Sequence, residues 1–181
     1  MLPVEPSAPL IRRNAHRAEA APFVLELFSK RAAVTRACTT AGLPACGIGF
    51  HSYSLPGCPC INLDLLLEWT QQFVLELLRC SGSRPIAWLT VPCGTFSRAR
   101  LRSGAQPLRS LRYIKGCPAA MADDALSRRI RHDNALADFA MTVINLCDKL
   151  RIPWFAVGAG SSFIWDLREW SNWKFQDVTF A

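Results

Sequence analysis

The stretch Ile86-Ala87-Trp88-Leu89-Thr90-Val91 is the clearest strand signal in this chain of 181 residues. It is apolar, it follows the breaker sequence Ser81-Gly-Ser-Arg-Pro85, and Pro92 ends it. A long basic loop comes next, then a helical pattern over residues 124–150, then a second short apolar run, Pro153–Val157. A strand, a helical crossover and a strand in this order predict two parallel strands of one sheet.

The same alternation of short apolar runs and helical patterns precedes Ile86. The pentapeptide Phe-Val-Leu-Glu-Leu occurs twice, and its neighbours place Phe23–Leu27 in a strand and Phe73–Leu77 in a helix. We expect strands over Phe23–Phe28, Ala45–Phe50 and Ile61–Asp64, and helices over Lys30–Ala41 (ended by Gly42), Leu65–Cys80 and Ser161–Trp170. This order predicts an α/β fold, an open and mostly parallel sheet with helices on both faces.

Composition limits the class of protein. Residues 1–22 are rich in alanine and proline and predict a flexible segment ahead of one domain over 23–181. We expect neither a secretory signal nor a membrane span, because no apolar run is long enough for either. Several of the eight cysteines lie in apolar runs, which favours reduced thiols in an intracellular protein. Zinc is the alternative, but only Cys58-Pro-Cys60 is closely paired and no C-x₂-C occurs.

Chemistry is expected where strands end, because open α/β sheets bind ligands at the carboxyl ends of their strands. Three such ends carry small or polar residues: Leu27-Phe28-Ser29, Pro92–Arg100 and Val157–Ser162. In the second, Cys93 follows the strand, and nearby arginines would favour its reactive thiolate form. The alternative is that Cys93 is one more buried cysteine and the arginines are solvated.

Two of these segments resemble a known family. Pro92-Cys93-x-x-Phe96-Ser97-x-Ala99-Arg100 is similar to the catalytic loop of cytosine-C5 DNA methyltransferases, and Leu25-Glu26-Leu27-Phe28-Ser29 is similar to that family's first motif. The resemblance covers about residues 23–170 and implies a Rossmann-like fold that binds S-adenosylmethionine (SAM). In that family a cysteine attacks C6 of a cytosine flipped out of the duplex, since a stacked base hides the reacting carbon.

The resemblance also implies roles for single residues. Cys93 matches the catalytic nucleophile. The cofactor-binding positions are Phe28, Ser29, Asp64 and Pro92. Thr95 and Ser97 match loop positions near the flipped nucleotide. Independently of the resemblance, the positive charge of Arg98, Arg100 and Arg102 in the same loop predicts contact with DNA or RNA.

The chain departs from the family at three supporting positions. Lys30-Arg31-Ala32-Ala33 replaces glycines that let the backbone approach the cofactor. The strand that ends at Phe50-His51 has no carboxylate for the ribose hydroxyls, and Gly158-Ala159 replaces the Glu-Asn pair that contacts the cytosine. The sequence therefore predicts weak or lost SAM-dependent methyl transfer, with a protein partner supplying target recognition. There are two alternatives. The chain could be a non-catalytic nucleic-acid-binding module on the same fold, or the product of a decayed reading frame that has no function now.

The positive charge of the chain is concentrated near the Cys93 loop. The net charge is +7, and residues 93–133 hold nine arginines and lysines against three aspartates. A DNA or RNA backbone would be attracted there, although a solvated, mobile loop is an equally simple explanation. His132-Asp133 could form a hydrolase triad with Cys93, but adjacent histidine and aspartate at a helix start are more simply a surface pair or a cap.

Overall fold

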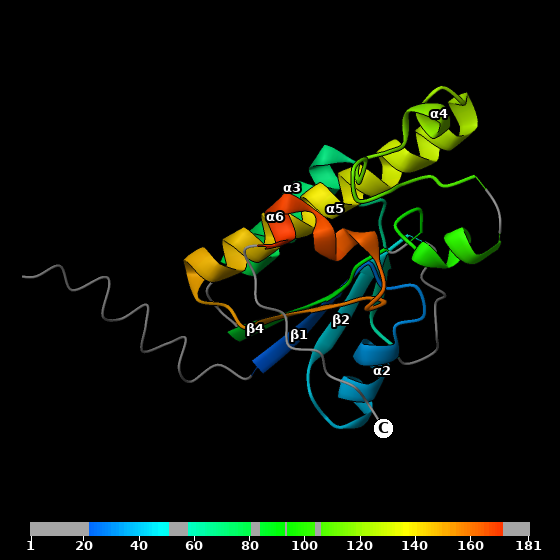
Figure 1. Cartoon of the computed structure of the whole chain (residues 1–181). Coiled ribbons are helices and arrows are strands. Elements are labelled where there is room, and N and C mark those ends of the chain that lie inside the picture. The colour runs from blue at the N-terminus through cyan, green and yellow to red at the C-terminus, as the bar shows by residue number, and fades with distance from the viewer. Residues whose placement is uncertain (1–21, 51–57, 81–83, 93, 104–105, 172–181) are drawn as a thin grey trace, which may run out of the picture.

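The computed structural model confirms an α/β fold built on an all-parallel sheet (Figure 1). It describes residues 22–50, 58–80, 84–92, 94–103 and 106–171. Within these residues the five strands are β1 (Pro22–Leu27), β2 (Ala45–Gly49), β3 (Cys60–Asn62), β4 (Arg84–Thr90) and β5 (Trp154–Val157). Their order across the sheet is β3-β2-β1-β4-β5, as in a Rossmann-like open sheet.

The direction of chain progression reverses between β1 and β4. From β1 the chain steps outward to β2 and β3, then returns so that β4 pairs with the other side of β1. The helix α3 (Glu68–Arg79) lies on this return path. A reversal of this kind leaves a crevice at the carboxyl ends of the two central strands, and that crevice is where open α/β sheets place their ligands.

Helices cover both faces of the sheet. In Figure 1, α2 (Ala33–Thr40) lies below the strands, and α3 and the long helix α5 (Asp124–Leu150) lie above them. The expected bounds of α5 are confirmed at both ends. Asp123 is its N-cap and accepts a hydrogen bond from Leu126 N at 2.8 Å, and Arg151 ends it in the left-handed conformation.

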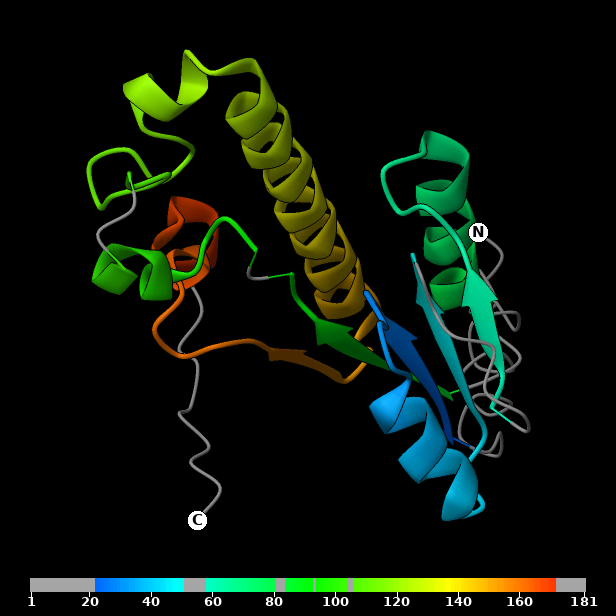
Figure 2. The ribbon, with the colours of Figure 1, turned by 90° about the vertical axis from the view of Figure 1, so that its right-hand side faces the viewer.

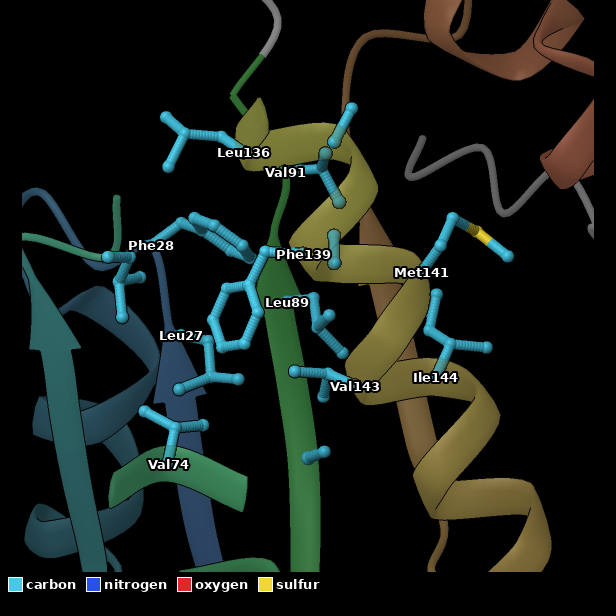
Figure 3. Packing of buried hydrophobic residues seen from close by; sticks show 14 of the residues in the cluster. Leu27, Phe28, Val74, Leu89, Val91, Leu136, Phe139, Met141, Val143 and Ile144 are labelled. Atoms are coloured by element: carbon cyan, nitrogen blue, oxygen red, sulfur yellow. The ribbon is translucent and has the colours of Figure 1, made fainter. Parts of the chain in front are cut away.

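The main core lies between the sheet and the α3–α5 layer. Alternate residues of the central strands face α5, so Leu27 and Leu89 pack beside Phe139 and Val143, with Val74 of α3 closing one side (Figure 3). All five are at most 3% exposed. This packing explains why the two copies of Phe-Val-Leu-Glu-Leu differ, since the first lies in β1 and the second on the amphipathic helix α3.

Several expected boundaries are wrong. β3 is only Cys60–Asn62, so Asp64 follows the strand, and α3 begins at Glu68. The single helix expected over 161–170 is instead η2, a 3-10 turn at Phe163–Asp166, followed by α6 (Arg168–Ser171). Leu167 between them is extended, with ψ 134°, which breaks the helix.

The long loop after β4 also holds two short helical segments. These are η1, a 3-10 segment at Arg98–Ser103, and α4 (Pro118–Met121). Figure 2 shows η1 beside the η2–α6 segment. A bridge between Ser97 and Ser162 and a hydrogen bond from Phe163 N to Phe96 O at 2.9 Å join the two segments. The loop after β4 is therefore held against the segment that contains η2 and α6.

Candidate functional site

A cavity of about 330 Å³ lies at the carboxyl ends of the central strands. Its volume is near the lower limit of small-molecule sites, which span roughly 300–1,000 Å³. The walls come from the residues that follow β1, β2, β3 and β4 and from the first half of α5. The lining residues are Phe28, Lys30, Phe50, Asp64, Leu65, Pro92, Gly94, His132, Asp133 and Leu136.

Three of the four positions assigned to the cofactor meet in this cavity. Phe28 follows β1, Asp64 follows β3 and Pro92 follows β4, and all three line the same space. Phe28 is buried, and its ring meets Phe139 edge to face with centroids 6.2 Å apart. Asp64 is half-buried and accepts a hydrogen bond from Leu66 N through Oδ1 at 2.9 Å. The cavity therefore combines an apolar floor with a fixed carboxylate.

Ser29, the fourth position, does not line the cavity. It is fully buried, its N–H donates to Ile48 O at 3.1 Å, and its Oγ accepts from Ala32 N at 3.0 Å. Ser29 thus closes the β1–α2 loop on itself. Lys30, at a position where the family carries glycine, lines the cavity instead, and its side chain is exposed.

The first turn of α2 is capped by residues of the chain itself. Buried Glu26 of β1 accepts hydrogen bonds from the N–H and the hydroxyl of Thr35, both at 2.7 Å to the same oxygen, Oε2. Backbone N–H groups at such a helix start bind phosphate in dinucleotide folds. Here Ala32 N and Thr35 N donate to Ser29 and Glu26, so these two N–H groups are not available to a ligand.

The end of β2 presents an aromatic side chain to the cavity. Phe50 is 54% exposed and lies at the position where a ribose-binding carboxylate would be expected. Gly49, just before it, comes so close to the loop after β1 that an added Cβ would lie 2.3 Å from Ser29 O. A flat ring at the rim of the cavity is suited to stacking on a planar heterocycle.

Cys93, the predicted nucleophile, lies outside the described residues. Pro92 and Gly94, which flank it in sequence, both line the cavity. Gly94 packs closely against α5, since an added Cβ would lie 2.6 Å from Asp133 Oδ2. The loop that carries Cys93 is thus bound to the cavity wall on both sides of the cysteine.

A buried polar network lies behind this loop. Thr95, expected to contact nucleic acid, is 3% exposed and donates its N–H to Asp133 Oδ2 at 2.5 Å. Its hydroxyl accepts from Arg109 Nε at 3.1 Å and Nη2 at 2.6 Å. Arg109 is itself 1% exposed, and desolvation lowers its pKa to about 10, so it remains charged at neutral pH. Thr95 therefore acts as a structural residue of the loop.

The remaining nucleic-acid positions lie on or beside η1. Arg98 forms an ion pair with Asp166, and its guanidinium lies 4.6 Å from the centre of the Phe163 ring. Ser97 is half-buried at the bridge to Ser162. Arg100 and Arg102 belong to η1, and their side chains lie outside the described part of the structure. The contact of Arg98 with Asp166 ties η1 to η2.

The end of β5 does not contribute to the cavity. Gly158 and Ala159 are absent from its lining, and Ala159 O accepts a hydrogen bond from Trp165 Nε1 at 2.8 Å. Within the described residues, the carboxylates at the cavity are Asp64 and Asp133 only. Neither comes from the β5 end, where the family places its cytosine-binding glutamate.

Sequence reasoning did not find the roles of Arg109 and Asp133. From the sequence alone, Arg109 is one of nine basic residues over 93–133 that favour either a nucleic-acid surface or a solvated loop, and His132-Asp133 is interpreted as a surface pair or a cap. The His132-Asp133 pair is present, with Asp133 Oδ1 3.2 Å from His132 Nδ1 in the first half of α5, but Asp133 Oδ2 also accepts a hydrogen bond from Thr95 N. No local sequence signal marks a contact that spans 38 positions.

Comparisons with protein-family models, with curated proteins and with solved structures find no match. Within the described ranges, no three histidine, cysteine or acidic side chains gather in a way that could hold a metal ion. In the same part of the chain, no helix has the length and apolar character needed to cross a membrane.

Proposed function

We propose that the chain is a methyltransferase-like protein that binds SAM in the cavity at the carboxyl ends of β1–β4, with weak or lost methyl transfer. The observation that carries the proposal is the convergence of Phe28, Asp64 and Pro92 on one cavity. These residues are far apart in sequence, and the family resemblance implies a cofactor-binding role for each of them. The walls also include both neighbours of Cys93 in the sequence.

The lining suits an adenosyl ligand. Phe28, Leu65 and Leu136 supply an apolar floor, and the exposed Phe50 ring can cover one face of a planar base. The Asp64 carboxylate is an acceptor for the adenine amino group. Lys30 supplies a positive charge that would attract the carboxylate of the methionine part. SAM carries no phosphate, which agrees with the internally capped start of α2.

The chemistry of methyl transfer is poorly supported by the same walls. Glycines are absent from the β1–α2 loop, the ribose-binding carboxylate is replaced by Phe50, and Gly158-Ala159 has no side chain that can hydrogen-bond a cytosine ring. Loss of one preorganised polar contact costs about 10²–10³ in rate. We therefore expect this chain to bind SAM but to transfer its methyl group slowly or not at all.

Calorimetric titration of the full chain with SAM tests the proposal. Asp64→Asn should weaken SAM binding at least about tenfold. The asparagine can still accept the hydrogen bond from Leu66 N, but it presents an amide donor in place of the carboxylate oxygen that would accept from the adenine amino group. Asp124→Asn, an exposed position in the first turn of α5, is the matched control and should bind like the parent. Absence of heat at millimolar SAM would contradict the proposal.

A specific observation favours nucleic-acid binding as the second candidate function. Arg128, Arg129 and Arg131 of α5 are exposed and contact no carboxylate among the described residues. Arg112 lies over the Tyr113 ring, with its guanidinium carbon 5.4 Å from the ring centre. These side chains are available to phosphates, whereas Arg98 is paired with Asp166 and Arg109 is buried.

A salt titration separates this second candidate from a merely solvated surface. Replacing Arg128, Arg129 and Arg131 with alanine should make the slope of log K against log salt concentration for single-stranded DNA or RNA shallower by about 0.7 per lost phosphate contact. The control removes the same charge at the opposite end of the sheet, with Arg84, Lys149 and Arg151 replaced by alanine. Equal losses in both triple variants would indicate nonspecific attraction to net charge.

A further inference from the structure

The structure brings together two thiols that the cavity does not use. Cys58 and Cys60 flank Pro59 at the start of the edge strand β3, and their sulfur atoms lie 3.6 Å apart. Residues two apart in an extended chain point to the same side, which places both sulfurs on one face of the strand. Both residues are half-buried, and both are free thiols.

The neighbouring strand leaves room for this pair. Gly47 of β2 lies opposite Cys60 in the parallel register, and an added Cβ there would lie 3.2 Å from Cys60 Sγ. Gly47 N also donates to Pro59 O at 2.9 Å, which holds the residue between the two cysteines. Because β3 is an edge strand and both cysteines keep part of their own surface exposed, a small reagent can reach the pair.

We propose that Cys58 and Cys60 form a redox modification site, in which low-molecular-weight disulfides such as oxidised glutathione close an intramolecular disulfide. The Cys58 thiolate attacks one sulfur of oxidised glutathione, forms a mixed disulfide and releases one glutathione thiolate, which takes up a proton. The Cys60 thiolate then attacks the Cys58 sulfur and releases the second glutathione. Two protein thiols are oxidised, and one glutathione disulfide is reduced to two thiols.

The electrostatic surroundings determine which step is slow. The pKa of Cys60 is raised to about 11, mainly because the thiol is partly buried. The hydrogen bond with Cys58 and the negative charges that Cys58, Cys46 and Glu26 can carry raise this pKa further. The Cys60 thiolate is therefore scarce at neutral pH, which slows closure of the mixed disulfide. Below this pKa the thiolate fraction rises about tenfold per pH unit, so closure should accelerate by about a hundredfold between pH 7 and pH 9.

The site is tested by oxidising the full reduced chain with excess oxidised glutathione and blocking remaining thiols with N-ethylmaleimide. Chymotryptic cleavage after Tyr53 and Leu63 isolates a peptide that contains only these two cysteines. We expect this peptide to lose two hydrogens and to carry no maleimide. Cys60→Ser should accumulate a glutathione adduct on Cys58, whereas Cys80→Ser, at an exposed cysteine elsewhere, should close the bond like the parent.

Three outcomes would overturn the proposal. The first is full maleimide labelling of both cysteines in the folded parent chain after oxidation. The second is a disulfide that joins Cys46 to Cys58 or Cys60. The third is a stable glutathione adduct on Cys58 in the parent at pH 9, where closure should be fast. Since each is read on the parent chain, a failure of a variant to fold leaves the test intact.

Discussion

Arg109→Ala is expected to lower the free energy of unfolding by about 3–5 kcal/mol, a large part of the roughly 5–15 kcal/mol that holds a domain together. The guanidinium donates to Thr95 Oγ1, to Asn134 Oδ1 at 2.7 Å and to the carbonyls of Ile114 and Ile130 at 2.6 and 3.2 Å. Its carbon also lies 3.6 Å from the centre of the Phe96 ring. Truncation leaves these acceptors without their donor and opens a cavity.

The charge of Arg109 is compensated from a distance. Within the described residues no carboxylate lies within ion-pair distance of it, and the nearby Asp133 only partly offsets the desolvation that lowers its pKa. The hydrogen bonds of the guanidinium therefore offset most of the free-energy cost of burying its charge. Arg109→Lys keeps the charge but fewer donors, and its stability should lie between those of the parent and Arg109→Ala.

Urea unfolding of the variants measures this effect. Arg112→Ala is the matched control, because Arg112 is exposed and lies over the Tyr113 ring, an interaction worth about 0.5–1 kcal/mol. A loss for Arg109→Ala no larger than that of Arg112→Ala would show that the network does not hold the Cys93 loop. Because Thr95 is bound to both Arg109 and Asp133, the loop should also exchange its amide hydrogens faster in Arg109→Ala.

Gly49→Ala is expected to cost about 3 kcal/mol, near the upper limit for overpacking a close-packed site. The added Cβ would lie 2.3 Å from Ser29 O, 2.8 Å from Ser29 N and 3.0 Å from Ser29 C. All three are backbone atoms, so no side-chain rotation can relieve the contact. Ser29 N donates to Ile48 O and Gly49 O accepts from Leu63 N, so displacement would strain the pairing that brings β1 and β3 to the cavity.

Gly160→Ala is the control for this second variant. Its added Cβ meets no atom within 4 Å, and we expect a change in stability of no more than about 0.5 kcal/mol. Thermal and urea unfolding of both variants should therefore differ clearly. A Gly49→Ala protein as stable as Gly160→Ala would contradict the close approach of β2 to the β1–α2 loop.

Local patterns were enough to predict most elements of the fold. The apolar run at Ile86–Val91 predicted β4, and the limits of α5 were predicted because its cap and its spacing lie within one segment. The final helix was wrong because a 3-10 turn and a short α-helix share nearly the same spacing of apolar residues over one or two turns. The sequence also placed the candidate cofactor residues at strand ends, where Phe28, Asp64 and Pro92 lie.

The amino-acid sequence by itself determined the elements, their alternation and hence the parallel sheet, since hydrophobic periodicity and capping act between residues close along the chain. Only the tertiary structure decided which distant segments meet. It placed β4 beside β1, removed Thr95 and Arg109 from the surface, and joined Thr95 to Asp133. The physical reason is that a polar side chain is buried only where donors and acceptors from several segments converge, and no single segment encodes that convergence.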